Sequence, residues 1–271
     1  MGKEENVSIF EDTQKICKSH SAVRNAIKLS NDLQEIFLEG DPVLFRPKVF
    51  EDPAKVIVSK RRSLEAALQH VESKTCVLNF ASATNPGGGV AWGSTAQEEG
   101  LCRCSTLYSN LSVKENWVRF YEPHRKQNNP LYNDDCIYTP DVLVFKTDTC
   151  CPELLSQKDW MKVNVITCAA PNLRTNKNGT ARVSVSDDEL ENLHIKRMRR
   201  ILSIAAAHCN EVVILGAYGC GAFKNPPEVV AKAMKKVIAE FRNYFRVIEF
   251  AVYCSPGEER NYTVFRNVLS E

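Results

Sequence analysis

The stretch that most directly indicates the fold is NPGGGVAWGSTAQEE, residues 85–99. It follows an apolar run at residues 76–81 that is typical of a buried strand. Three consecutive glycines remove every side chain from a short length of backbone, so a ligand can approach the amide groups closely. A tight turn without a ligand would use the same residues. The acids Glu98 and Glu99 begin the next predicted helix, where the helix dipole alone already favours them.

A second glycine-rich segment, GAYGCGAFKN at residues 216–225, also follows an apolar run and precedes a predicted helix. It matches neither the G-x-G-x-x-G dinucleotide fingerprint nor a Walker A loop, because no Lys-Ser/Thr pair follows the glycines. Its backbone amides could still hold an anion, and Tyr218 or Phe223 could lie against a sugar or base. Two such loops at one sheet edge favour a ligand with a bridging diphosphate and a terminal sugar near the paired glutamates.

Strand-like and helical patterns alternate along most of the chain. The expected strands lie at 55–59, 76–81, 163–169, 212–216 and 247–254, with a proline-interrupted strand or pair at 138–146. The expected helices lie at 13–38, 63–71, 94–111, 187–208, 226–245 and 258–269. Ser94 with Gln97 resembles a capping box at the start of the third helix. Residues 116–159 are the least regular, and we expect strands and loops there. The alternation predicts a three-layer α/β architecture with a largely parallel sheet, in which ligands bind at the carboxyl ends of strands.

The composition is that of an ordinary globular protein. The chain has 271 residues, 44% of them hydrophobic, and its 35 basic and 33 acidic side chains give a net charge of +2. It contains no run of about 18 apolar residues, and its N-terminus carries acids where a signal peptide needs a basic and then an apolar stretch. The near-neutral charge disfavours binding to nucleic acid by phosphate neutralisation. We therefore expect a cytoplasmic protein that does not contact membranes or recognise nucleic-acid sequences, with the nucleus left open for a eukaryotic source.

The eleven cysteines suggest three kinds of site, and the sequence favours none of them. An odd number in a chain of this length argues against a disulfide framework. No C-x-x-C pair is present, so we expect no metal. A nucleophilic thiol would need a base, and the five histidines lie mostly in helical patterns. We expect reduced thiols, of which only Cys220 lies where it could touch a ligand.

The triplet GGG, seven residues and the triplet QEE together resemble the signature of poly(ADP-ribose) glycohydrolases. Further segments are similar to the microbial type of that family: NFASATNP at 79–86, LCRCSTLY at 101–108, VITCAAPN at 165–172 and GAYGCGAF at 216–223. The resemblance covers roughly residues 10 to 270. It implies a macrodomain-like three-layer α/β/α sandwich with a mixed, largely parallel sheet. Residues 1–50 would form an N-terminal helical extension and residues 51–271 the catalytic domain.

The resemblance also implies roles for individual residues. Glu99 would be the catalytic acid/base, and Glu98 would position the ribose beside the scissile bond. The implied substrate-binding residues are Asn85, Gly87, Gly88, Gly89, Gln97, Gly219, Cys220, Gly221, Ala222 and Phe223. The substrate would be poly(ADP-ribose) or an ADP-ribosylated protein, the product ADP-ribose, and no cofactor would be needed.

The chemistry of this reaction constrains the two glutamates. Cleavage of an O-glycosidic bond needs an acid to protonate the leaving oxygen and a base to activate water, and one carboxyl can perform both steps in sequence. Adjacent residues of a helix point about 100° apart. We therefore do not expect Glu98 and Glu99 to face each other across the bond like the two carboxyls of an ordinary glycosidase.

Two alternatives remain beside a poly(ADP-ribose) glycohydrolase. One is a hydrolase of another ADP-ribose linkage, on a protein side chain or a nucleobase. The other is a non-catalytic ADP-ribose reader, which would have no need for the intact Gln-Glu-Glu triplet. The leaving-group end of the cleft could be shaped by residues 115–135, with Trp117, Tyr121, His124 and Arg125, or that region could be a solvated surface loop.

Overall fold

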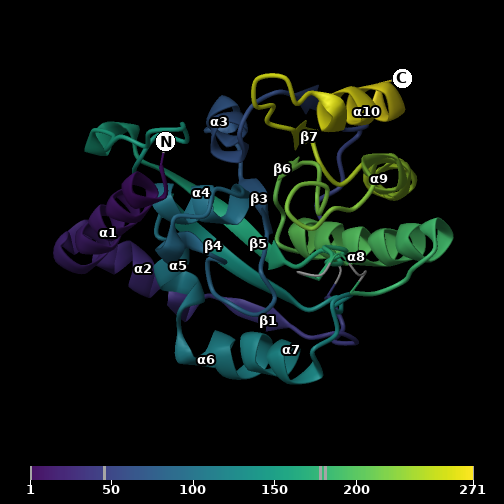
Figure 1. The fold of residues 1–271 in the computed structure, drawn as a ribbon. Helices are drawn as coiled ribbons and strands as arrows, with labels where there is room; N and C mark the ends of the chain where they lie inside the picture. The colour runs from purple at the N-terminus through teal and green to yellow at the C-terminus, as the bar shows by residue number, and fades with distance from the viewer. Residues whose placement is uncertain (1, 45–46, 177–178, 180–181, 271) are drawn as a thin grey trace.

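The computed structural model describes residues 2–44, 47–176, 179 and 182–270. Within these residues one sheet contains β1 (Glu35–Phe37), β2 (Lys55–Ser59), β3 (Thr75–Phe80), β4 (Cys136–Val144), β5 (Met161–Cys168), β6 (Val212–Leu215) and β7 (Val247–Ala251). The strand order is β1-β4-β5-β3-β6-β7-β2 (Figure 1). The pairs from β5 to β2 are parallel, whereas β4 pairs antiparallel with both β1 and β5. The mixed, largely parallel sheet is therefore confirmed.

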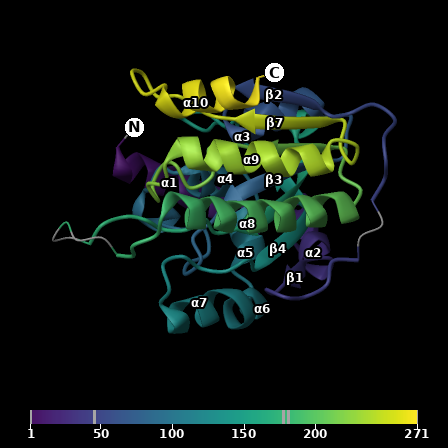
Figure 2. The ribbon, with the colours of Figure 1, turned by 90° about the vertical axis from the view of Figure 1, so that its right-hand side faces the viewer.

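Helices cover both faces of this sheet. They are α1 (Lys3–Ser19), α2 (Ser21–Asp32), α3 (Ser63–Ala67), α4 (Gln97–Cys104), α5 (Leu107–Leu111), α6 (Lys114–Asn116), α7 (Glu122–Gln127), α8 (Asp187–Ala207), α9 (Pro227–Phe241) and α10 (Arg260–Leu269). Figure 2 shows α8, α9 and α10 stacked along one face, while α1 to α5 lie on the other side. The expected three-layer sandwich is confirmed.

Strand β3 divides the core into two parts. Its alternate residues face opposite sides, as in any strand: Cys76 and Leu78 pack with α8 and α9, and Val77 packs with α3 and α4. Burial on both faces explains why this segment is a continuous apolar run in the sequence. Because β3 pairs directly with β6, the two glycine-rich loops leave the same sheet edge side by side, as predicted.

The N-terminal segment differs from the single helix expected at 13–38. It forms α1 and α2, which meet at His20, whose backbone is extended with φ −79° and ψ 120°. The earlier start was missed because two of the four residues that α1 buries, Asn6 and Thr13, are polar, which weakens the helical pattern. Strand β1 then joins the sheet beside β4. The proposed boundary near residue 50 remains a prediction, although this strand of the extension belongs to the same sheet.

Two other local predictions were wrong. The helix expected at 94–111 begins at Gln97 after an N-cap at Ala96, so Ser94 does not cap it, and extended Ser105 separates α4 from α5. Residues 116–159 contain β4 and loops as expected, but also a π-helical turn at Trp117–Tyr121 that leads into α7. In the described part of the chain, every helix is too short or too polar to span a bilayer.

Helix α1 packs directly on the end of the first glycine-rich loop. Gly93 has φ +75°, and a methyl group there would lie 2.3 Å from the carbonyl oxygen of Lys3. The Asn6 side-chain amide donates to the Gly93 carbonyl at 3.2 Å. Nearby, the Thr13 hydroxyl donates to the carbonyl of Arg103 at 2.6 Å. The extension therefore supports the loop and the helix that carry the paired glutamates.

Candidate active site

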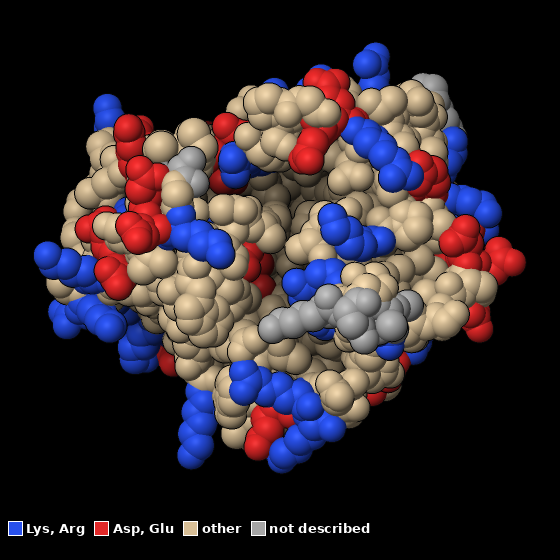
Figure 3. Space-filling model, in the orientation of Figure 1, with Lys and Arg blue, Asp and Glu red and all other residues tan. Residues whose placement is uncertain are grey.

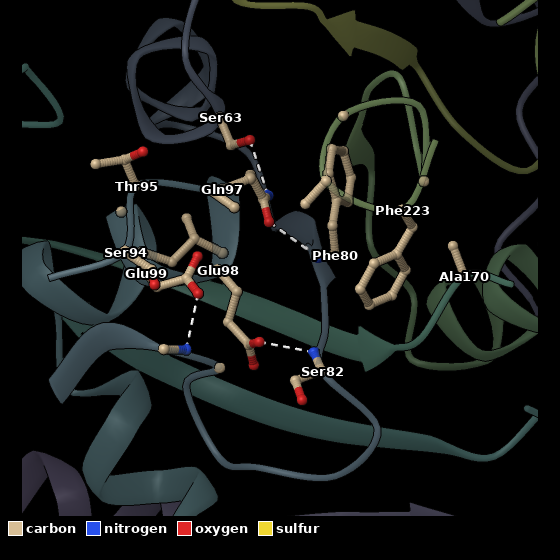
Figure 4. Close-up of a pocket in the computed structure, with 18 of the residues that line it drawn as sticks. Ser63, Phe80, Ser82, Ser94, Thr95, Gln97, Glu98, Glu99, Ala170 and Phe223 are labelled. Carbon is tan, nitrogen blue, oxygen red and sulfur yellow. Dashed lines mark hydrogen bonds between the residues drawn. The ribbon is translucent and has the colours of Figure 1, made fainter. Parts of the chain in front are cut away.

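A cavity of about 520 Å³ lies between the two glycine-rich loops, and Figure 3 shows the molecule hollowed on this face. Its volume is typical of a site for one small-molecule ligand. The predicted site residues that line it are Asn85, Gly88, Gly89, Gln97, Glu98, Glu99, Gly219, Gly221, Ala222 and Phe223. The structure thus brings together residues from two loops and the start of α4 (Figure 4).

Gly88 is the point at which the two glutamate side chains meet. It has φ +59°, a conformation that favours glycine. A methyl group on Gly88 would lie 2.6 Å from Glu99 Oε1 and 3.0 Å from Glu98 Oε2. Although adjacent residues leave a helix in different directions, both carboxyl groups end beside the same glycine. A side chain at residue 88 would therefore displace one or both carboxyl groups.

Glu99 keeps one carboxyl oxygen free of protein partners. Its Oε1 accepts a hydrogen bond from the backbone N–H of Gly89 at 2.8 Å. Its Oε2 is buried and has no hydrogen-bond partner among the described residues. A buried carboxyl oxygen without a partner is costly to maintain, and this carboxyl lines the cavity. The arrangement suits a group whose partner is a ligand.

Glu98 is more tightly held. It is 2% exposed, and it accepts hydrogen bonds from the Ser82 backbone N–H at 2.7 Å and from the Asn79 amide at 3.2 Å. Burial above all, with a smaller contribution from the charge of Glu99, raises the pKa of Glu98 to about 8, although these hydrogen bonds lower it. Near neutral pH the Glu98 carboxyl is therefore mostly protonated, so the pair does not carry two full charges.

Gln97 connects three elements at the start of α4. Its side-chain oxygen accepts from the Phe80 backbone N–H at 2.9 Å. Its amide nitrogen donates to the Leu78 carbonyl at 2.8 Å and to the Ser63 hydroxyl at 3.0 Å. Figure 4 shows this amide between the end of β3 and α3. Because both amide hydrogens bond to the protein, Gln97 positions the two glutamates that follow it.

The second loop is held from below by Asn225. The Asn225 amide donates to the carbonyls of Pro171 at 2.7 Å and Gly219 at 3.0 Å, and its oxygen lies 2.9 Å from His194 Nε2. At the tip the loop is open, because a methyl group on Gly221 would meet no atom within 4 Å. This part of the backbone is therefore accessible to a ligand.

Comparison with known proteins agrees with this geometry. The family model described as "Microbial-type PARG, catalytic domain" matches residues 3–147. The chain belongs to the microbial-type poly(ADP-ribose) glycohydrolases. This family is one of glycosidases, and the chain is accordingly an enzyme of that class.

Several solved structures resemble the whole glycohydrolase. Poly(ADP-ribose) glycohydrolase from Thermomonospora curvata is 26% identical with a TM-score of 0.84, and the match covers 98% of this chain and 100% of that one. The same enzyme bound to the inhibitor ADP-HPD is 27% identical with a TM-score of 0.79, and the match covers 97% of this chain and 99% of that one. The Deinococcus radiodurans enzyme in complex with ADP-ribose is 30% identical with a TM-score of 0.76, and the match covers 90% of this chain and 97% of that one. No curated protein sequence matches the chain significantly.

Two residues predicted to bind substrate in this glycohydrolase do not line the cavity. Gly87 has φ +67°, and a methyl group there would lie 2.7 Å from the Tyr108 ring, so close packing under the loop requires this glycine. The Cys220 side chain packs against the core, where burial raises the pKa of its thiol well above the usual range. Both residues lie in the loops around the site, but neither the Gly87 position nor the Cys220 side chain lines the cavity.

Residues 115–135 of the glycohydrolase divide into a buried and an exposed part. Tyr121 and His124 are buried, and His124 lies 2.7 Å from both the Phe120 carbonyl and the Asn133 side-chain oxygen. Arg125 is exposed and donates to the Thr84 carbonyl at 2.7 Å. The sequence left open whether this region shapes one end of the cleft or is a solvated loop. In the structure Tyr132 lines the cavity and Arg125 contacts the first loop, whereas the side chains of Tyr121 and His124 belong to the core.

Several residues that line the cavity were not predicted from the sequence. They include Phe80, Ser82, Tyr132, Ala170, Arg174, Tyr253 and Asn261. Most of these follow the carboxyl ends of β3, β5 and β7, so the rule that ligands bind at this edge contained the signal. Tyr132 follows no strand; it lies after α7 with φ +54°, within residues 115–135, the region whose role the sequence left open. No three His, Cys, Asp or Glu side chains gather as a potential metal site within the described residues.

Proposed function

We propose that this glycohydrolase cleaves the O-glycosidic bond between two riboses of poly(ADP-ribose) and releases ADP-ribose, with Glu99 as the acid/base. The observation that carries the proposal is the meeting of both carboxyl groups at Gly88 inside the cavity. The cavity volume of about 520 Å³ suits one ADP-ribose unit held between the two loops. The ADP-ribose complex of the Deinococcus radiodurans enzyme supports the same ligand class.

Glu99 is the better candidate for proton transfer because one of its oxygens is free. Gly89 fixes the other oxygen through its backbone N–H. In the first step the Glu99 carboxyl gives its proton to the leaving oxygen as the bond to the anomeric carbon breaks. In the second step the Glu99 carboxylate takes a proton from a water molecule while the oxygen of that water adds to the anomeric carbon. Glu99 thereby regains the proton that it gave up in the first step.

Glu98 fixes the turn after β3 and keeps its carboxyl protonated near neutral pH. Its hydrogen bonds with Ser82 and Asn79 fix the turn after β3, and its remaining lone pairs can accept ribose hydroxyl groups. The raised pKa of Glu98, about 8, keeps a proton at this site near neutral pH.

The test compares two substrates, and it compares the wild-type enzyme with Glu99→Gln. The enzyme is incubated with auto-modified polymer and with singly ADP-ribosylated protein, and released ADP-ribose is measured by chromatography. We expect release from the polymer, and we expect Glu99→Gln to lower the rate about 10³-fold or more while ADP-ribose binding stays near wild type. Release from singly modified protein alone would instead favour another linkage, and an active Glu99→Gln enzyme would exclude Glu99 as the acid/base.

A further inference from the structure

An exposed aromatic residue and an exposed arginine lie together beside the mouth of the cavity. The Arg125 guanidinium carbon lies 4.7 Å from the centre of the Trp117 ring, and 37% of Trp117 is exposed. We propose that this pair, the Trp117–Arg125 platform, binds the adenosine of the polymer unit from which ADP-ribose is cleaved. The inference rests on the proposed function and extends it to the leaving group.

Hydrogen bonds attach the platform to the first glycine-rich loop. Arg125 Nε donates to the Thr84 carbonyl at 2.7 Å, and its terminal nitrogen donates to the Asn85 side-chain oxygen. Asn85 lines the cavity and follows Ser82, whose backbone N–H holds Glu98. The platform therefore lies on the glutamate side of the cavity mouth, next to the place where the bond is cut.

The size of the cavity requires a surface outside it for the rest of the polymer. A volume of about 520 Å³ has room for one ADP-ribose unit. The leaving oxygen belongs to the ribose of an adenosine, so the next adenine lies only one sugar away from the scissile bond. A base at that distance emerges at the rim near Asn85, where the platform is exposed.

The chemistry of the platform suits a base followed by a diphosphate. Nucleobases of flexible strands stack on aromatic rings and on guanidinium groups. Two neighbouring cations are already paired, Arg119 with Glu115 at 3.0 Å and Lys126 with Glu122 at 3.1 Å. The partners found for Arg125 in the described structure are neutral oxygens and the indole ring, so its charge is available to phosphate. Figure 3 shows basic side chains gathered over the α7 end of this face, below the hollow.

The experiment compares two substrates that share ADP-ribose and differ in the leaving group. One is a poly(ADP-ribose) oligomer, and the other is an ADP-ribose glycoside of a small fluorogenic phenol, which is too small to reach the platform. We expect Trp117→Ala to lower kcat/KM for the oligomer about tenfold more than kcat/KM for the phenol glycoside. Trp117→Phe, which keeps an aromatic ring, should recover most of the loss.

Matched variants and a binding measurement make the result decisive. Lys126→Ala removes an exposed cation of the same helix that is paired with Glu122, and it should leave the ratio of the two kcat/KM values unchanged. In the Glu99→Gln background, Trp117→Ala should weaken binding of the oligomer more than binding of ADP-ribose. Equal losses on both substrates, or no loss on the oligomer, would overturn the platform while leaving the proposed hydrolysis intact. Failure of the wild-type enzyme to cleave either substrate would instead count against the proposed function.

Discussion

Glycines at the first loop and at the tip of the second loop have different surroundings. In the first loop the glycines are crowded: a methyl group on Gly89 would lie 2.3 Å from the Ser94 hydroxyl, and one on Gly88 would meet both glutamates. In the second loop the base is crowded as well, since a methyl group on Gly219 would lie 2.7 Å from Asn225 Nδ2, but one on Gly221 at the tip would meet no atom within 4 Å. Glycine in the first loop therefore allows protein to pack on protein, whereas Gly221 leaves space for something outside the protein.

This contrast matches what each loop has to do. Catalytic groups must be held to within about 0.5 Å of their working geometry, and the first loop is fixed by Glu98, Glu99 and α1. The second loop is fixed at its base by Asn225 and open at its tip. A glycine-rich sequence alone does not distinguish a packed loop from an open one, because the difference lies in the neighbours.

Among changes that keep both glutamates, the largest expected effect comes from filling the crowded loop. Gly88→Ala places a methyl group against both carboxyl groups and forces a positive φ on a residue that disfavours it. We expect kcat/KM for the polymer to fall by about 10²-fold or more, since a displacement of the catalytic group of about 1 Å has that cost. Steady-state kinetics measure the loss, and circular dichroism shows whether the fold persists. Near-normal activity would mean that the glutamates do not depend on this contact.

The second effect concerns the buried carboxyl of the packed loop. The pKa of Glu98 rises from 4.5 in the unfolded reference to about 8, so between these values the folded chain holds a proton that the unfolded chain has lost. This contribution to stability is complete below pH 4.5 and is lost as the pH rises through 8. The Gln side chain of Glu98→Gln is neutral at every pH. As the pH rises through this range, the free energy of unfolding of wild type should therefore fall relative to that of Glu98→Gln by a few kcal/mol, on the order of 1.4 kcal/mol per pH unit.

Urea unfolding at pH 5, 6.5 and 8 measures that trend for both proteins. Glu115→Gln, at an exposed position with 67% of its side chain accessible, controls for the loss of one carboxyl group. Parallel pH profiles of the free energy of unfolding for wild type and Glu98→Gln would show that Glu98 ionises like an ordinary glutamate. The packed loop would then hold no proton on Glu98 near neutral pH.

The smallest effect on the fold is expected at the open loop. Gly221→Ala adds a methyl group where no protein atom lies within 4 Å and where φ is not positive, so the free energy of unfolding should change by about 0.5 kcal/mol or less. ADP-ribose affinity should nevertheless fall about tenfold, because the ligand needs the space of the missing side chain. Calorimetric titration with ADP-ribose tests this. Unchanged affinity would indicate that the ligand does not approach residue 221 closely.

The sequence predicted the features that local pattern determines. Buried parallel strands such as β3 are continuous apolar runs, and adjacent parallel strands bring their following loops to one edge. Other features depend on contacts between distant segments. Helix α1 buries polar Asn6 against Gly93, and Tyr132 lines the cavity from the segment after α7, a helix that contacts the first loop through Arg125. Nothing in the spacing of these residues indicates such partners.

The burial of Glu98 is a third case of this kind. At the start of a helix, the dipole favours an ionised glutamate, and the sequence offers no reason for the opposite. In the fold the carboxyl is buried beside the end of β3, and this loss of water raises its pKa even though Asn79 and Ser82 donate hydrogen bonds that lower it. The protonation state of this site is a property of the assembled fold.

The contact of α1 with Gly93 has a consequence for protein engineering. A designer who transplants the glycine-rich loop and its glutamates into a non-catalytic macrodomain would transfer the chemical groups but not their support. The turn at Gly93 accommodates the backbone of Lys3 and accepts a hydrogen bond from Asn6. Loop and helix therefore form one transferable unit, although more than 80 residues separate them along the chain.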